Sequence, residues 1–305
     1  ETGAGSIMTT EYVDIRQSMT VAQSMAHIKE TGIHKETIYT CYVTDKRKLI
    51  GIVSAKDLMT TDDGILISEL METEIISVRT YTDKEEVAQL FRKYDLLALP
   101  VLDKDGLMVG IVTFDDAMDV MVEEATEDIT KMAAINPSEK TYFNTSTFAH
   151  AKNRIPWLLI LMLTSIITGT IITKYEDAFA AIPLLVSFIP MLMDTGGNSG
   201  SQACVSIIRG ISLNEIEFRD LGRVVWKEIR VSVLCGVCLA IACFAKIIVV
   251  DMLLLKSESV TYLVAFVVCA TMAVTVCLAK IVGSTLPLLA KKIGFDPAVM
   301  ASPFI

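Results

Sequence analysis

Residues 193–203, MDTGGNSGSQA, place polar groups between two strongly apolar stretches of the chain. Five of these groups follow a helical spacing of i, i+3, i+4, i+7 and i+8 and therefore share one face: Asp194, Gly197, Asn198, Ser201 and Gln202. An acid at mid-membrane depth costs about 2.5–3.5 kcal/mol on insertion scales, so the acid is expected to face water or a partner rather than lipid. Carboxylate, amide, hydroxyl and glycine-exposed carbonyl oxygens suit a hydrated cation. The spacing predicts an ion path.

A tight crossing of small residues between membrane helices is the alternative explanation for the glycines. It does not account for an acid, an asparagine and a glutamine on one stripe. A path for Zn²⁺ or Cu⁺ would need His, Cys or Met at the facing positions, and the stripe has none. The spacing does not separate Mg²⁺ from Ca²⁺ or Mn²⁺.

A second group of candidate ligands is the acidic run at residues 115–128, DDAMDVMVEEATED, which has seven acids and no base. On a helix, Asp116, Asp119, Glu123 and Glu127 share a face, and each like-charge pair costs roughly 0.2–0.5 kcal/mol. A solvated helix face is the ordinary interpretation of a charge run. The density here favours a cluster that stays compact only while divalent cations neutralise it. Three further acids are placed to join it: Asp83, Glu85 and Asp95.

The composition divides the chain into two halves. Residues 1–140 carry 26 acids against 14 Lys and Arg, whereas residues 141–305 carry 10 acids against 13 bases and hold the long apolar runs. The simplest interpretation is a soluble acidic module followed by a membrane domain. Nucleic-acid binding is not expected, because phosphate contacts need clustered Lys and Arg. A cation is the partner that suits an acidic module.

Cysteine and histidine usage argues against an enzyme. Six of the seven cysteines lie in the apolar half, and Cys235 and Cys238 form a lone C-x-x-C without a second pair. The three histidines, His27, His34 and His150, have no metal-ligand spacing. No Ser–His, Cys–His or zinc constellation is available, so we expect no catalytic site.

The acidic half contains an internal repeat, in which each copy reads strand, helix, strand, strand, helix. A motif G-h-x-[ST]-x-x-D occurs in both copies, at residues 51–57 and 110–116. This pattern resembles the CBS domain, which occurs as tandem pairs that sense ligands. In that family the hydroxyl meets a nucleotide phosphate and the Asp meets the ribose, which implies a nucleotide (ATP) site at Ser54, Asp57 and Thr113. The alternative is that Ser54 or Asp57 simply caps a helix.

The apolar half predicts several membrane spans, because stretches near 155–173, 178–208, 231–250 and 259–290 approach or exceed the ~20 residues that a span needs. A fifth begins after Pro297. The basic residues gather in the loops on one side, which the positive-inside rule places in the cytoplasm together with the repeats: Lys152, Arg154, Arg209, Arg219, Arg223, Lys227, Arg230, Lys291 and Lys292. Lys246 and Lys280 are expected to extend their ammonium groups to the membrane surface, and a role in the pore is the alternative.

A CBS pair, an acidic connecting helix and the motif GGNSGSQ together resemble the MgtE family of magnesium transporters and channels. The resemblance implies a homodimer in a lipid bilayer, with the pore on its two-fold axis and closed when cytoplasmic Mg²⁺ is plentiful. It also implies a plug helix at residues 114–135 and regulatory Mg²⁺ at nine positions: Asp83, Glu85, Asp95, Asp116, Asp119, Glu124, Glu127, Asp128 and Asp296. Asp194 stands where other members have Gly, and Ser201 where many have Asn.

The expected fold is α/β in the tandem CBS module and all-α in a polytopic membrane domain of five spans, the fifth truncated. The expected divisions are the tail of a missing N-terminal acidic domain, two CBS domains, the plug helix, a linker and the membrane domain: residues 1–5, 6–67, 68–120, 114–135, 136–153 and 154–305. The family's pore aspartate is expected beyond Ile305.

The sequence thus predicts a Mg²⁺-selective, channel-like transporter of the plasma (inner) membrane that cytoplasmic Mg²⁺ closes. One alternative is a CBS-regulated transporter of another divalent cation, Co²⁺, Mn²⁺ or Ca²⁺. The other is a nucleotide-gated transporter of an anion or osmolyte. That last alternative requires basic residues on the polar stripe, and these are missing.

Overall fold

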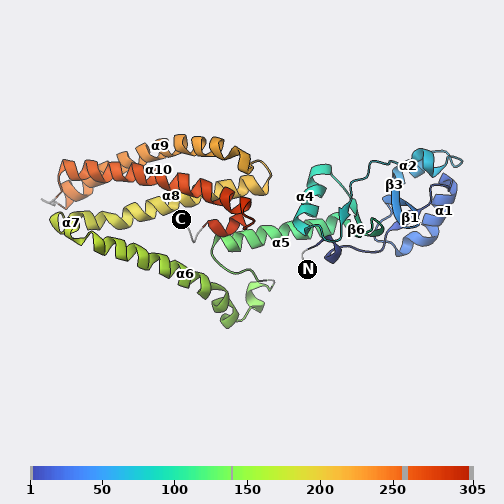
Figure 1. Cartoon of the computed structure of the whole chain (residues 1–305), viewed down its shortest axis with the longest axis horizontal. Coiled ribbons are helices and arrows are strands. Elements are labelled where there is room, and N and C mark those ends of the chain that lie inside the picture. Colours follow the sequence, from blue (N-terminus) through green and yellow to red (C-terminus); the bar gives the residue numbers. More distant parts are fainter. Residues whose placement is uncertain (1–2, 139, 256–259, 302–305) are drawn as a thin grey trace. The chain divides into compact units, whose positions relative to one another are not determined.

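The computed structural model describes residues 3–138, 140–255 and 260–301, without the side chains of Ala178 and Ala181. The chain divides into two compact units, Glu1–Thr126 and Glu127–Ile305. The first unit combines strands and helices, and the second consists of helices (Figure 1). The predicted division into an α/β module and an all-α domain is confirmed.

The first repeat builds a three-stranded sheet in the order β1-β2-β3, with β1 parallel to β2 and β2 antiparallel to β3. Its elements are β1 (Val13–Ile15), α1 (Val21–Thr31), β2 (Thr40–Asp45), β3 (Lys48–Ser54) and α2 (Ala55–Thr60), with the short η1 (Ala4–Ser6), η2 (Gly32–His34) and α3 (Ile67–Leu70) around them. Helix α1 begins where Thr20 and Gln23 form a reciprocal capping box. Apolar residues of β1 and β2, such as Val13 and Val43, are buried.

The second repeat has the same order of elements and the same sheet topology, β4-β5-β6. They are β4 (Val78–Arg79), α4 (Lys84–Tyr94), β5 (Ala98–Leu102), β6 (Met108–Thr113) and α5 (Phe114–Met132), whose last residues belong to the second unit. Val87 and Phe91 of α4 pack against Leu99, Val101 and Val112 of the sheet. The predicted strand, helix, strand, strand, helix repeat is confirmed in both copies.

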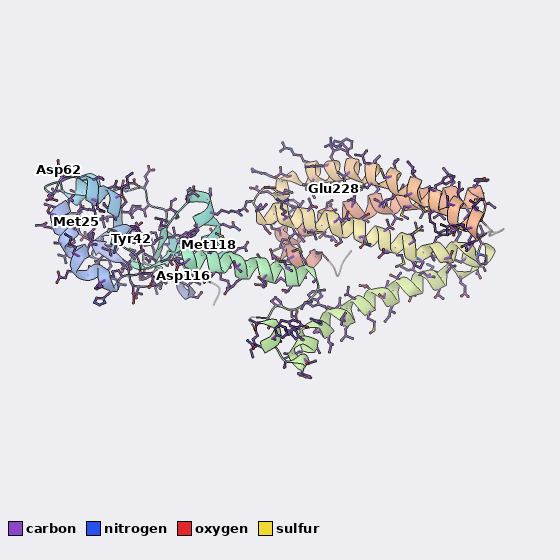
Figure 2. All side chains as sticks on the ribbon, turned by 180° about the vertical axis from the view of Figure 1, so that it is seen from behind. Met25, Tyr42, Asp62, Asp116, Met118 and Glu228 are labelled. Atoms are coloured by element: carbon purple, nitrogen blue, oxygen red, sulfur yellow. The ribbon has the colours of Figure 1, made fainter. Side chains whose placement is uncertain are left out.

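The two repeats exchange the segments that precede them. Thr9, ahead of the first repeat, forms an antiparallel bridge with Ile111 of β6, and Glu72, ahead of the second, forms one with Ile52 of β3. Tyr42, labelled in Figure 2, is fully buried in a cluster with Ile111 and other residues from both sheets. The repeats are therefore joined through backbone hydrogen bonds and a shared apolar layer.

The second unit consists of helices. Four are long: α6 (Thr147–Lys174), α8 (Leu184–Ser212), α9 (Leu221–Lys246) with its π-helical extension Ile247–Leu254, and α10 (Tyr262–Lys292). The short α7 (Glu176–Ala181) lies between α6 and α8. Short 3₁₀ turns lie at Tyr142–Asn144, Phe218–Asp220 and Pro297–Met300. Within the described residues, three helical regions are long and apolar enough to cross a membrane: Thr147–Lys174, Phe218–Leu254 and Tyr262–Lys292. Helix α8 falls outside this group because its polar stripe lowers its mean hydropathy.

The predicted span at 178–208 is divided in the structure, since α7 ends at Ala181 and α8 begins at Leu184. Pro183 lies at this junction, where a proline is tolerated because the first N–H groups of a helix have no intrahelical partner. The predicted fifth span is represented by the short turn Pro297–Met300, and its continuation at residues 302–305 lies outside the described residues.

Helix α10 packs along both α8 and α9, and Figure 1 shows the three helices running alongside one another. Residues of α10 such as Val264 and Val268 form an apolar cluster with Phe188 of α8 and Cys243 of α9. By contrast, no residue of α6 is buried, so its apolar surface is left to lipid or to another chain.

The two lysines expected to extend to the membrane surface behave differently. Lys246 pairs with Asp251, 2.8 Å from Nζ to Oδ2, and its ammonium lies over the ring of Phe188. Lys280 does not match the expectation: it is 5% exposed, on the face of α10 that also buries Gly283 and Ser284. Helix packing has enclosed the side chain that hydropathy placed at the helix end.

The exchanged N-terminal segment generates a stability prediction. A Cβ at Gly110 would lie 2.6 Å from the carbonyl oxygen of Thr9, so Gly110→Ala forces the segment off β6 and is expected to cost about 1–3 kcal/mol of unfolding free energy. Gly64→Ala is the matched control, because a Cβ there meets no atom within 4 Å. Urea unfolding measures both, and hydrogen exchange at the Thr9 and Ile111 amides reports the local effect. Equal stability of the two variants contradicts the prediction.

Candidate functional site

Helix α8 divides its small and polar residues between two faces. Gly196 and Gly200 are buried against α10, where a Cβ on Gly196 would lie 2.7 Å from Cγ2 of Thr275 and the Gly200 carbonyl contacts Gly283. Gly197 lies on another face, where an added Cβ meets no atom within 4 Å. The small-residue crossing and the polar stripe, which the sequence offered as alternatives, therefore coexist on different faces of one helix.

The polar stripe stays accessible along its length. Asp194, Asn198 and Gln202 are exposed, and Gly197 and Ser201 are half-buried. The Asn198 amide Nδ2 donates to Oδ2 of Asp194 over 3.1 Å, one helical turn away. A shallow groove begins at this turn, lined by Asn198, Ser201, Gln202, Val205 and Ser206. Oxygen donors are thus held in a row on a surface that the packed helices leave open.

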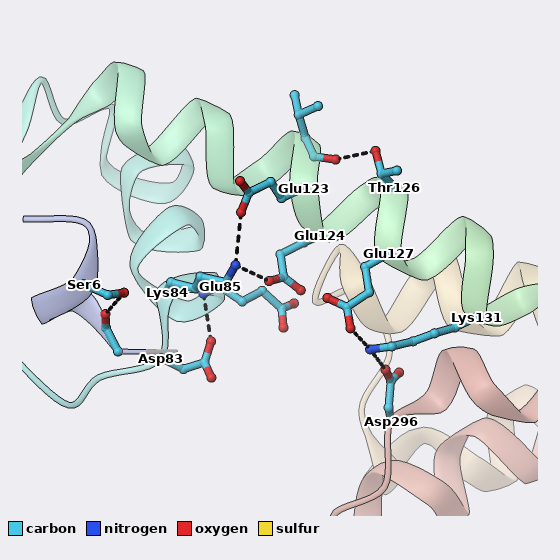
Figure 3. Close-up of polar contacts among 12 residues, drawn as sticks. Ser6, Asp83, Lys84, Glu85, Glu123, Glu124, Thr126, Glu127, Lys131 and Asp296 are labelled. Carbon is cyan, nitrogen blue, oxygen red and sulfur yellow. Dashed lines mark hydrogen bonds and ion pairs between the residues drawn. The ribbon is translucent and has the colours of Figure 1, made fainter. Parts of the chain in front are cut away.

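The acidic run forms one side of α5, and α4 supplies a counter-charge to it. Lys84 Nζ lies 3.1 Å from Oε2 of Glu123 and 3.5 Å from Oε1 of Glu124. Partial burial acts to lower the pKa of Lys84, but the hydrogen bond to Glu123 and the charge of Glu124 outweigh it, so its pKa lies above the ordinary value. Figure 3 shows the neighbouring Asp83 and Glu85 on the same end of α4. Acids and an ammonium group are therefore gathered together.

A second ammonium group lies near the end of α5. Lys131 Nζ contacts a carboxylate oxygen of Glu127 and lies 2.6 Å from Oδ2 of Asp296 (Figure 3). The other oxygen of Asp296, Oδ1, accepts the Ala298 N–H at 2.8 Å and caps the turn Pro297–Met300. Burial acts to lower the pKa of Lys131, but the bonds to Asp296 and Glu127 raise it well above the ordinary value. Both ammonium groups are charged at neutral pH.

The other predicted metal positions have individual local roles. Asp83 caps the N-terminus of α4 by accepting the Glu85 N–H at 2.9 Å, and Asp95 ends that helix in the left-handed conformation with φ +52°. Asp116 accepts the hydroxyl of Thr113 at 2.6 Å, and Asp119 is exposed on α5. Asp128 has an interaction partner in the structure.

The carboxylate chemistry fits a hard divalent cation, since Mg²⁺ prefers oxygen ligands and retains several waters. Across the described part of the chain, however, no three His, Cys, Asp or Glu side chains gather closely enough to hold an ion. Lys84 and Lys131 instead each lie between two carboxylates. The sequence analysis missed Lys84 and Lys131, although the i, i+4 spacing of Glu127 and Lys131 was a readable signal.

The two CBS motifs hold their own polar groups. Ser54 Oγ accepts the Asp57 N–H at 3.0 Å and donates to Oδ2 of Asp57 at 2.5 Å, so Ser54 caps α2. Thr113 makes the equivalent hydroxyl–carboxylate bond to Asp116. Helix capping by Ser54 is confirmed, and a nucleotide at this motif would have to share or replace the Ser54–Asp57 bond.

Comparisons with known proteins match both units. The CBS domain family matches residues 4–63 and 67–123, and the MgtE family, described as divalent cation transporters, matches residues 189–305. The magnesium transporter MgtE of Thermus thermophilus is 37% identical over 306 residues, covering 100% of this chain and 66% of its own length. The chain belongs to the MgtE family. This is a family of transporters rather than enzymes, and with its apolar helices the chain is a membrane protein.

Another MgtE relative aligns with this chain over nearly the same length. The magnesium transporter MgtE of Bacillus subtilis is 34% identical and covers 99% of this chain and 65% of its own length. The chain thus spans about two thirds of the length of these MgtE relatives. The chain in a crystal structure of the cytosolic domain of the Mg²⁺ channel MgtE in complex with ATP is 45% identical, with 39% of this chain and 49% of that chain covered and a TM-score of 0.39.

The two faces of α8 are distinguished by a matched pair of glycine variants. Gly196→Ala places a methyl group against Thr275 and is expected to lower the stability of the helical unit by about 1–3 kcal/mol. Gly197→Ala meets open space, so its higher helix propensity is expected to leave stability unchanged or raise it by up to about 1 kcal/mol. Thermal unfolding in detergent compares them. A loss of stability in Gly197→Ala equal to that in Gly196→Ala would show that both faces are packed.

Proposed function

We propose that this MgtE-family protein transports Mg²⁺ through a path lined by the polar stripe of α8. The observation that carries the proposal is the open row of oxygen donors from Asp194 to Gln202, backed by a face of small residues that packs on α10. The family is described as divalent cation transporters, and several of its members are named magnesium transporters. The absence of basic residues on the stripe disfavours an anion.

The oxygen ligands on the stripe suit an ion that keeps its hydration shell. Mg²⁺ sheds water reluctantly, and carbonyl, amide and hydroxyl groups hold its hydration shell without trapping it. Gly197, Asn198 and Ser201 supply these groups, and Asp194 adds one negative charge that attracts a cation. An acid beside an apolar belt is stabilised when it faces a water-filled path, here shared between the α8 helices of two subunits across a two-fold axis.

In this proposal, the acidic residues of α5 gate the path. The carboxylates of α4 and α5 repel one another, and a divalent cation that bridges them favours the compact arrangement. We place regulatory Mg²⁺ at the nine predicted acids, with α5 acting as a plug when cytoplasmic Mg²⁺ is high. The basic loops that follow α8 and α10 support, by the positive-inside rule, a cytoplasmic position of the CBS pair at the plasma membrane.

ATP is a second regulatory ligand in this proposal. The motif residues Ser54 and Asp57 lie at the end of β3 and the start of α2, where a hydroxyl and a carboxylate are available to phosphate and ribose groups. Thr113 holds the corresponding place at the end of β6. The Ser54–Asp57 bond competes with the nucleotide, so binding at this motif is expected to be weak.

Uptake into liposomes tests the ion path in the full-length protein. Asn198→Leu keeps the side-chain size and removes an oxygen donor, so Mg²⁺ uptake is expected to fall about tenfold or more. Ser165→Ala is the control, because Ser165 lies exposed on α6 and its hydroxyl donates to the Leu161 carbonyl of the same helix. Wild-type protein is expected to pass Mg²⁺ faster than Ca²⁺ or Mn²⁺. Wild-type uptake by Asn198→Leu would contradict the path.

Electrophysiology tests the sensor separately. Replacing Asp119, Glu124 and Glu127 by their amides removes three charges from α5, so a bridging cation gains less, and the Mg²⁺ concentration that half-closes the channel is expected to rise about tenfold or more. The matched control neutralises Asp62 and Asp63, two exposed acids at the end of the first repeat. Unchanged Mg²⁺ inhibition in the α5 variant would refute the sensor assignment.

A further inference from the structure

Two lysines occupy the positions between carboxylates that a bridging cation would take. Lys84 lies between Glu123 and Glu124, and Lys131 lies between Glu127 and Asp296. The side chains of Lys84 and Lys131 are 22% and 24% exposed, so both are partly buried against their carboxylate partners. Each belongs to the compact unit that contains both of its partners.

The contact of Lys131 is the closer of the two. Its Nζ lies 2.6 Å from Oδ2 of Asp296, and the remaining oxygen of Asp296 is committed to the Ala298 N–H. A divalent cation that joins Glu127 to Asp296 needs oxygen lone pairs that now face the ammonium group. Two cations cannot occupy the space between the same pair of carboxylates, because they would repel each other at contact distance.

We propose that Lys131 and Lys84 are tethered competitors of the regulatory divalent cation and that they set the concentration at which it binds. The inference rests on the proposed regulatory role of Glu124, Glu127 and Asp296. A tethered ammonium group is present at a high, constant effective concentration, so Mg²⁺ must displace it before bridging the acids. At low Mg²⁺ the two ammonium groups then offset only part of the repulsion among the carboxylates, and bound Mg²⁺ replaces a single positive charge by a double one.

The competition is measured as Mg²⁺-dependent thermal stabilisation of the full-length protein, with KCl keeping the ionic strength constant. Lys131→Gln and Lys84→Gln remove the competing charge and retain a hydrogen-bonding side chain. Each is expected to lower the Mg²⁺ concentration for half-maximal stabilisation about two- to fivefold, the range that corresponds to the strength of partly exposed ion pairs. Lys131→Arg keeps the charge and is expected to stay near the wild-type concentration.

Lys104→Gln is the control for the loss of one positive charge. Lys104 is exposed in the turn between β5 and β6 and makes no hydrogen bond or ion pair to any described residue. It is expected to leave the Mg²⁺ dependence unchanged. A shift in Lys104→Gln as large as that in Lys131→Gln would reduce the effect to net charge and overturn the inference.

The remaining outcomes separate this inference from the function on which it rests. If wild-type protein is stabilised by Mg²⁺ and both glutamine variants need the same or more Mg²⁺, the lysines are structural partners and the inference fails while the sensor stands. If Mg²⁺ stabilises neither the wild type nor any variant, the sensor itself is refuted. If Lys131→Gln does not fold, Lys84→Gln decides the question in the other unit.

Discussion

Charge balance along α5 is the constraint on which the acidic module depends. Seven carboxylates lie between Asp115 and Asp128, and closely spaced like charges on one helix oppose its packing against anything acidic. Two ammonium groups, those of Lys84 and Lys131, offset this repulsion because each lies between two carboxylates. Such partly exposed pairs contribute modestly, about 1 kcal/mol or less each, which leaves the balance open to change by a divalent cation. Ion pairs this weak can be replaced when a divalent cation binds, as a cation sensor requires.

Helix α8 meets a different requirement, since it must pack tightly and still offer oxygen donors. Two faces of the helix meet these two requirements separately. Gly196 and Gly200 bring the α8 backbone close to α10, whereas Gly197 leaves another face of the helix open beside Asn198. Close helix approach through small residues is a common solution in membranes. Here it also holds the polar stripe on a rigid, well-packed helix, which keeps the donors at constant spacing.

Local patterns were sufficient for much of the fold. The duplicated G-h-x-[ST]-x-x-D motif and the repeated order of strands and helices predicted both α/β repeats, and the long apolar stretches predicted the helices of the second unit. The same reasoning failed at Lys280, because hydropathy records position along a helix but not which face a neighbouring helix covers. It also misjudged the division between α7 and α8, where Pro183 ends the continuous apolar stretch.

The sequence by itself determined the family, the repeat, the spacing of the polar stripe and the density of acids, because these are properties of residues close together in the chain. Only the tertiary structure decided which glycines of α8 pack and which stay open. It alone brought Lys84 against Glu124 and Lys131 against Asp296, and the latter pair is separated by 165 residues. The physical reason is that ion pairs and helix contacts depend on distance in space, and chain spacing predicts that distance only within a turn or two of one helix.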